Sequence, residues 1–142
     1  MMTQLRSWWL ITFLAFASPV VHGEIVVVVA LDSPLQQMTI REVSDIYLGR
    51  LKAAAGEKLL VLDHPREGAL RERFFKQVNG MDLRRLNAYW ARLQFSGETQ
   101  PPVSLDDSKS VLEMVRRNRH AIGYVDASAV DKSVRTVLTL KE

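Results

Sequence analysis

A short turn between a predicted strand and a predicted helix holds the residues best suited to bind an anion. Residues 59–62 form an apolar run typical of a buried strand, and a helix is expected from about residue 69. Helix N-termini present free backbone N–H groups and a positive dipole end, and both attract anions. We therefore predict an oxyanion site at this turn. Its candidate ligand-binding residues are Arg66, Gly68, Ala69 and Arg71.

Two neighbouring residues affect this site in opposite ways. Gly68 has no side chain, so a ligand can approach the backbone closely there. Glu67 opposes anion binding, because its carboxylate repels a ligand of the same charge. The alternative interpretation is an ordinary strand–helix turn, in which Glu67 stabilises the positive end of the helix. The sequence leaves both interpretations open.

No pattern of residues indicates an enzyme. The chain has no cysteine, which removes thiol catalysis and cysteine zinc sites. His64 and His120 have no metal-binding partner at helical or loop spacing, and a loop histidine such as His64 is usually solvated. Asp63 precedes His64 and suggests a polar pair at a strand end. There is no nucleophile elbow and no glycine-rich phosphate loop. We expect no catalysis, no metal and no cofactor.

The charge of the chain argues against nucleic acid as a partner. The formal net charge at pH 7 is only +3, and 25% of the residues are charged. Nucleic-acid-binding domains usually carry a larger and clustered basic excess. Arg116, Arg117 and Arg119 do cluster, but they lie at the end of a predicted helix, where cations complement the negative dipole end. We expect no nucleic-acid partner.

The first 23 residues have the layout of a secretory signal peptide. Arg6 supplies a basic start, residues 8–16 are almost entirely apolar, and Pro19 precedes small and aliphatic residues at a cleavage site after Gly23. The apolar run is too short for a stable membrane span. An uncleaved N-terminal anchor is the alternative. We expect export to the periplasm and a mature domain of residues 24–142.

The rest of the chain alternates strands with helices and predicts one α/β domain with a mixed or parallel sheet. The run at 24–31 is β-branched without alternation, as in a strand covered on both faces of a parallel sheet. Further strands are expected at 59–62, 121–125 and 134–140. Four helices are expected. The first follows a capping box that begins at Thr39, and the second ends at about Val78. The third follows Asp82, and the fourth runs from about residue 106 to 118.

Some finer expectations concern loops and apolar faces. Residues 52–57 are small and polar and are expected to form a loop. Ile40 is expected on the buried face of its helix, together with Val43, Ile46 and Tyr47. Tyr89, Trp90 and Phe95 have a core-like spacing, and packing in the core is the simplest interpretation of all three.

Three segments, in order, resemble the substrate-binding proteins of phosphate ABC transporters, especially a short group of phosphate-binding-protein-like domains. Ile46-Tyr47-Leu48-Gly49-Arg50 resembles the family's "IF-x-G-[KR]" helix end. Residues 86–102, LNAYWARLQFSGETQPP, resemble the "YW…F-x-G…PP" stretch of the short group. Ala121-Ile122-Gly123-Tyr124-Val125 resembles the "G-x-IGY" strand. The resemblance covers essentially the whole of residues 24–142.

This resemblance implies a single lobe of the type-2 periplasmic-binding-protein fold, with a mixed sheet flanked by helices. It also implies a solute-binding role for phosphate or a related oxyanion, and a membrane transporter or sensor as partner. The family's second lobe binds phosphate with an arginine and a Ser-Gly-Thr sequence. Here only Gly68 agrees by position, and Asp63, Glu67 and Ala69 stand at the other places. The alternative function is therefore a non-catalytic interaction module that has lost its ligand.

Overall fold

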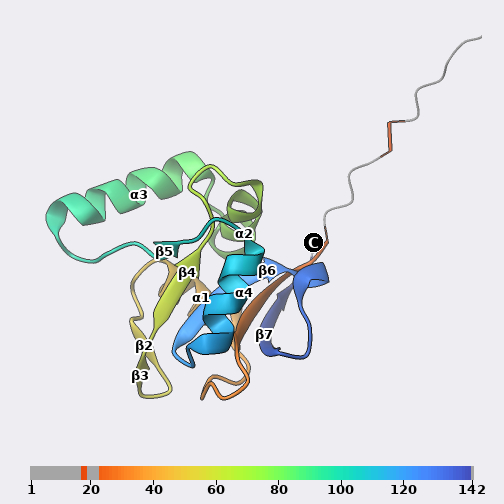
Figure 1. Ribbon diagram of the computed structural model, residues 1–142. Coiled ribbons are helices and arrows are strands. Elements are labelled where there is room, and N and C mark those ends of the chain that lie inside the picture. The colour runs from red at the N-terminus through yellow and green to blue at the C-terminus, as the bar shows by residue number, and fades with distance from the viewer. Residues whose placement is uncertain (1–16, 19–22, 142) are drawn as a thin grey trace, which may run out of the picture.

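The computed structural model describes residues 17–18 and 23–141 (Figure 1). Most of the predicted signal peptide lies outside the described residues, so the leader and its cleavage after Gly23 stay predictions. In the described part of the chain, no helix combines the length and the apolar character needed to cross a membrane. Every described helix and strand falls between Ile25 and Leu140.

One five-stranded mixed sheet organises the domain. Its spatial order is β5-β4-β6-β1-β7. β4 is parallel to β5 and β6, whereas β1 is antiparallel to β6 and β7. β1 therefore runs against the other four strands, and the predicted mixed α/β sheet is confirmed. The strands are β1 (Ile25–Ala30), β4 (Leu60–Asp63), β5 (Val103–Ser104), β6 (Ala121–Asp126) and β7 (Val134–Leu140).

The apolar run of β1 lies in the interior, as the sequence predicts. All six of its residues are buried. The predicted parallel environment is wrong for this strand, because both of its neighbours are antiparallel. A run without alternation indicates coverage on both faces, and that coverage does not depend on the direction of the neighbouring strands.

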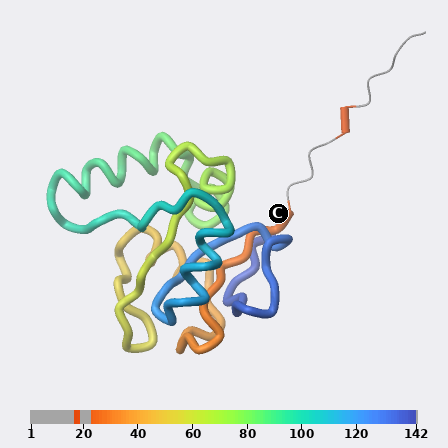
Figure 2. The backbone as a smooth tube through the Cα atoms, viewed as in Figure 1, coloured from red at the N-terminus to blue at the C-terminus, as the bar shows by residue number. Residues whose placement is uncertain are grey.

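Helices lie on both faces of the sheet (Figure 2). The buried side chains form two clusters. Ile25, Val27 and Val29 face one cluster with α1 and α2, and the alternate residues Val26 and Val28 face the other with α4. A chain that starts at Gly23 thus contains both clusters. The helices are α1 (Ile40–Tyr47), α2 (Ala69–Asn79), α3 (Leu83–Ser96), α4 (Ser108–Arg117) and the short 3₁₀ helix η1 (Ala127–Ala129).

Helix boundaries follow the signals in the sequence. The predicted capping box is confirmed: the Thr39 hydroxyl accepts from the Glu42 N–H, and the Glu42 carboxylate accepts from the Thr39 N–H. Asp82 and Asp107 cap α3 and α4, and each carboxylate accepts one backbone N–H from the first turn of its helix. Gly97 ends α3 in the left-handed conformation, with a φ of 72° that glycine adopts without strain.

Three local expectations are wrong. Residues 52–57 do not form a loop, because β2 (Ala53–Ala54) and β3 (Glu57–Lys58) form a small antiparallel hairpin. Ile40 is exposed, since it occupies the first position of α1, beyond the edge of the core. Phe95 is 98% exposed. The last turns of α3 extend past the sheet, so nothing covers this ring (Figure 1).

Gly123 permits the close packing of α4 on β6. A Cβ atom at this position would lie 2.5 Å from Cγ1 of Val111 on α4. We predict that Gly123→Ala lowers the free energy of unfolding by about 1–3 kcal/mol, because the added methyl group overpacks the core. Urea denaturation measures this change. In a Val111→Ala background the same substitution is expected to cost much less, and an equal cost in both backgrounds would contradict the explanation.

Candidate functional site

The candidate site lies at the edge of the sheet where the parallel strands end. β4, β5 and β6 run in the same direction, so their carboxyl ends meet at one edge. Helices α2 and α4 begin beyond that edge, where ligands of open α/β sheets bind. A cavity of about 180 Å³ opens between the end of β4, α3 and β5. Its polar lining residues are Asp63, His64, Arg66, Arg71, Asn87, Gln94 and Ser104.

A buried ion pair forms the base of this cavity. Arg71 Nε donates to Asp63 Oδ2 at 2.8 Å, and the two side chains are only 7% and 4% exposed. The other carboxylate oxygen, Oδ1, accepts from the Tyr124 hydroxyl at 2.5 Å and from the His64 N–H at 2.8 Å. Both oxygens of Asp63 therefore have donors, which a buried carboxylate requires.

Arg71 also connects the turn to α3. Its Nη1 donates to the Arg66 carbonyl oxygen and to Asn87 Oδ1, each at 3.0 Å. The guanidinium carbon lies 5.3 Å from the centre of the Phe75 ring, within range of a cation–π contact. The second terminal nitrogen, Nη2, donates to no acceptor among residues 17–18 and 23–141. Arg71 also lines the cavity.

Helix α2 begins with a glycine cap that leaves its first turn open. Gly68 is the N-cap, with extended backbone and no side-chain acceptor for the helix. Its own N–H donates to the Pro65 carbonyl oxygen at 2.8 Å. In the described part of the chain, the N–H groups of Ala69 and Leu70 have no acceptor. Such groups at the positive end of a helix favour an anion.

Arg66 and Glu67 stand in solvent beside this helix start. Their side chains are 72% and 76% exposed, and Arg66 Nε lies 3.7 Å from Glu67 Oε1. The same oxygen accepts from Asn87 Nδ2 at 3.3 Å. An exposed pair of this kind contributes at most about 1 kcal/mol. A stronger anion can therefore compete with Glu67 for the guanidinium of Arg66.

The four predicted ligand residues lie close together but in different settings. Arg66 and Arg71 line the cavity, and Gly68 and Ala69 begin α2 next to it. Sequence reasoning did not find Asn87, which reaches the site from α3, twenty residues after the turn. A polar residue on a helix carries no signal of its partner, so only the folded chain reveals this contact.

His64 differs from the expectation of a solvated loop residue. It is 5% exposed, and Nε2 lies 2.7 Å from the carbonyl oxygen of Tyr124. Because a carbonyl only accepts, Nε2 carries the hydrogen. The expected polar pair with Asp63 is present, but it joins the His64 backbone N–H to the carboxylate. His64 thus ties the end of β4 to β6.

Two buried tyrosines close the cluster from the core side. Burial raises the pKa of Tyr47 and of Tyr124 well above the usual range, and the charge of Asp63 raises both pKa values further. The Tyr47 hydroxyl donates to the Leu62 carbonyl oxygen at 2.9 Å. Tyr124 stacks on Phe74 with ring centres 3.7 Å apart. Both hydroxyls therefore act as neutral donors.

Comparison with solved structures identifies the fold. A chain from Clostridium perfringens, described as a phosphate ABC transporter substrate-binding protein and solved with bound phosphate, is similar with a TM-score of 0.65 and 22% identity. An ABC-type phosphate transport receptor from Vibrio cholerae gives 0.63 and 16%, and PstS from Borrelia burgdorferi gives 0.59 and 11%. The chain has the fold of a periplasmic binding protein. No family model and no curated protein matches it.

The chain spans a little under half the length of the three solved chains that it resembles. The similarity covers 81% of this chain but only 44%, 45% and 46% of the three solved chains. Among the described residues, no three histidine, aspartate or glutamate side chains gather as a metal site would require. The candidate site lies at one edge of a single sheet, where the start of α2, Arg66 and Arg71 stand beside the carboxylates of Asp63 and Glu67.

The Asp63–Arg71 pair leads to a prediction about stability. We expect Arg71→Met to lower the free energy of unfolding by about 3–5 kcal/mol, because it leaves the Asp63 carboxylate buried without its cation. Adding Asp63→Asn should restore most of this loss, since the remaining buried groups are neutral. Urea denaturation of both variants, with exposed Arg117→Met as control, measures the effect. A double variant no more stable than Arg71→Met would contradict this explanation.

The raised pKa values lead to a second prediction. The Tyr47 hydroxyl ionises at about pH 10 in the unfolded chain but only at higher pH in the folded protein. Its contribution to stability is therefore fully present below pH 10 and is lost as the pH rises above that value. Stability should therefore fall above pH 10. In Tyr47→Phe the fall should be shallower by up to about 1.4 kcal/mol per pH unit. Urea denaturation between pH 9 and 11 tests this, and identical slopes would refute it.

Proposed function

We propose that this chain is an exported solute-binding module that captures phosphate or a related oxyanion for a membrane transporter or sensor. The observation that carries the proposal is the open start of α2 beside Arg66 and Arg71, at the edge of the sheet where strands end. The fold supports it, since similar solved chains include phosphate-binding proteins of ABC transporters. Such a partner requires export, as the predicted leader provides.

The proposed contacts come from three kinds of donor. The N–H groups of Ala69 and Leu70 meet the anion along the helix axis, and Gly68 lets it approach the backbone. The Arg66 side chain breaks its contact with Glu67 and moves from solvent onto the anion. Arg71 supplies Nη2 from below, and its hydrogen bond to Asp63 holds the guanidinium in place. The carboxylate of Asp63 offsets part of the charge of Arg71, so we expect weak binding.

Calorimetric titration of residues 23–142 with phosphate, and separately with sulfate, tests this function. We predict saturable binding that weakens at least tenfold in Arg66→Ala, because a charge-assisted hydrogen bond contributes about 1.5–3 kcal/mol. Gly68→Asp should abolish binding, since its carboxylate would occupy the helix start. Arg117→Ala, on the last turn of α4, is the matched control. A folded protein that shows no heat at millimolar phosphate would refute oxyanion capture.

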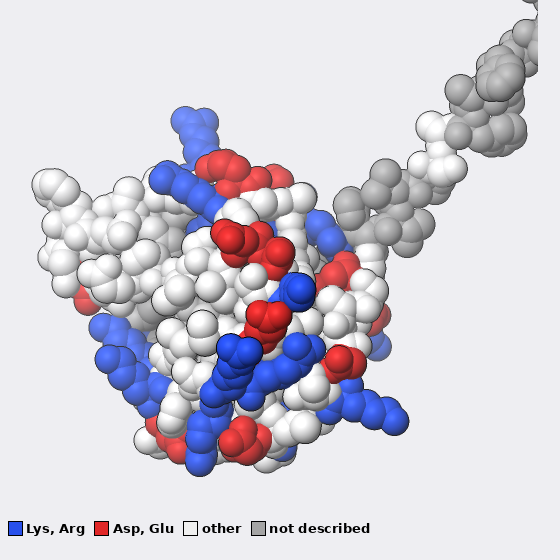
Figure 3. Space-filling view, viewed as in Figure 1, with Lys and Arg blue, Asp and Glu red and all other residues white. Residues whose placement is uncertain are grey.

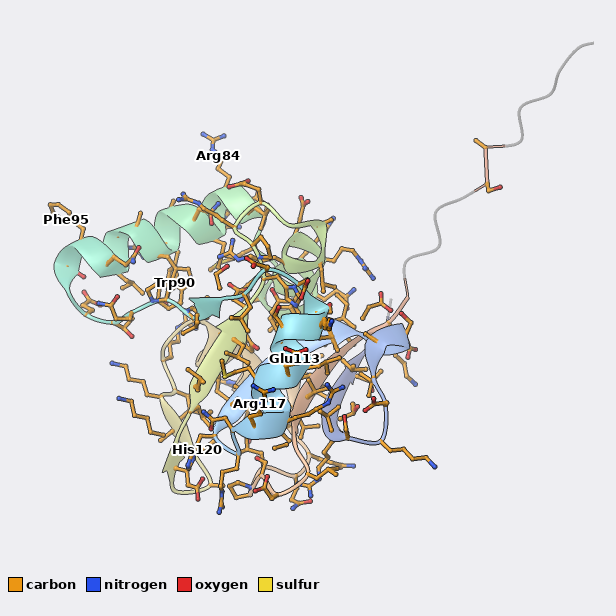
Figure 4. The ribbon with its side chains drawn as sticks, viewed as in Figure 1. Arg84, Trp90, Phe95, Glu113, Arg117 and His120 are labelled. Atoms are coloured by element: carbon orange, nitrogen blue, oxygen red, sulfur yellow. The ribbon has the colours of Figure 1, made fainter. Side chains whose placement is uncertain are left out.

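A protein-interaction module is the second candidate, and the exposure of Phe95 favours it. This ring is 98% exposed and points away from the domain at the end of α3 (Figure 4). Figure 3 shows uncharged side chains around the far end of this helix, while the exposed arginines of α3 are Arg84, Arg85 and Arg92. Exposed aromatic side chains on uncharged surfaces often anchor protein interfaces.

A photo-crosslinking residue at position 95 tests the second candidate in the producing cell. We expect one discrete membrane-protein adduct at position 95 and none at Thr139, an exposed position on β7. Adding Phe95→Asp to a crosslinker at the neighbouring Gln94 should remove the adduct, because a charge at the anchor opposes burial. Equal crosslinking from positions 95 and 139 would contradict a docking role for α3.

A further inference from the structure

A second and larger cavity lies below α3, beside the β2–β3 hairpin. Its volume is about 440 Å³, within the range of small-molecule sites. The hairpin, the first half of β4 and the segment after α3 enclose it. Apolar side chains form much of its wall, chiefly Leu51, Leu59, Leu60, Val61 and Val103. An occupant must therefore carry a sizeable apolar group.

Trp90 lines this cavity as well as the smaller one, and it has a buried donor without a partner among the described residues. The residue is 4% exposed. Its Cη2 atom lies 3.0 Å from the position of a Cβ on Gly49, another lining residue, so any side chain there would crowd the ring. The indole Nε1–H is buried and has no acceptor among the described residues. A ligand with an acceptor atom can satisfy it.

Two ammonium groups give the cavity a preference for negative charge. Lys52 and Lys58 both line it, and both are exposed and form no ion pair within the described part of the chain. The hairpin pairs Ala53 with Lys58, and the Leu59 N–H donates to the Lys52 carbonyl oxygen, so the backbones of the two lysines lie on neighbouring segments. Figure 3 shows basic side chains beside this hairpin. Glu98 is the one acidic residue in the lining, so the positive charges exceed the negative.

We propose that this cavity binds a small apolar carboxylate, with its hydrocarbon part against the apolar wall. The carboxylate accepts from the Lys52 and Lys58 ammonium groups, and the Trp90 N–H supplies a neutral donor. This cavity is distinct from the proposed oxyanion site, although Trp90, Pro101 and Pro102 line both. The inference does not depend on phosphate binding, because it uses neither the start of α2 nor its arginines.

The experiment uses nuclear magnetic resonance of ¹⁵N-labelled residues 23–142. Trp90 is the single tryptophan of this segment, so its indole N–H gives one resonance. The probes are naphthalene-1-carboxylate and its neutral match, naphthalene-1-carboxamide. We expect the carboxylate to shift the Trp90 indole and the Gly49 and Gly97 amide resonances saturably. We expect it to bind at least tenfold more tightly than the carboxamide.

Lysine variants separate charge recognition from apolar binding. In the double variant Lys52→Ala and Lys58→Ala, we expect the tenfold preference to vanish while the carboxamide affinity stays unchanged. The matched control is Lys132→Ala with Lys141→Ala, two exposed lysines outside the cavity, which should keep the preference. Trp90→Phe, checked for an intact fold by circular dichroism and titrated by calorimetry, should weaken carboxylate binding severalfold.

Three results would overturn the proposal. One is equal affinity of the unmodified protein for both probes, and another is the absence of any shift at millimolar carboxylate. The third is a shift confined to the Trp90 indole and the His64 and Gly68 amides, which would place the probe in the oxyanion cavity. That last result would leave the proposed function standing, so the two ideas fail separately.

Discussion

Asp63 and Arg71 place opposite charges in the interior at the end of β4, where neither is tolerated without the other. Removing one partner from such a pair leaves an uncompensated buried charge, which is strongly destabilising. The pair fixes the turn after β4 against α2, and through Asn87 it fixes α3. Tyr124 and His64 extend the same network to β6. The edge that faces a ligand is therefore held by hydrogen bonds from four separate elements.

This network also determines what the edge can offer a ligand. Arg71 lies in the cavity with its charge partly offset and with only Nη2 unused, so it cannot bind an anion as a free guanidinium would. Arg66 is free to move, and the glycine-capped start of α2 adds neutral donors. A single lobe provides one wall of a cleft, and hinge closure over a ligand needs a second. High affinity would require another surface opposite this edge.

Helix α3 stands between two cavities of different chemistry. Trp90 lines both, with arginine, asparagine and serine side chains on one side and mainly aliphatic side chains with two lysines on the other. The helix extends beyond the sheet and ends at the exposed Phe95. Its position depends on the Arg71–Asn87 contact, on the packing of Leu86 and Trp90, and on the Tyr89 hydroxyl, which donates to the Leu48 carbonyl oxygen. The fold alone does not assign a function to either cavity. Their functions have to be inferred from the side chains that line them.

The sequence by itself determined the order of the main helices and strands, the caps of α1, α3 and α4, and the burial of β1, because these depend on local hydrogen bonds and on apolar runs. It also located the turn that carries Arg66 and Gly68. Tertiary structure alone decided that Arg71 pairs with Asp63, that His64 is buried, and that Phe95 is exposed. Each of these depends on contacts between segments that are distant in the sequence, such as β4 with β6 or α2 with α3. Residue spacing along the chain does not predict those contacts.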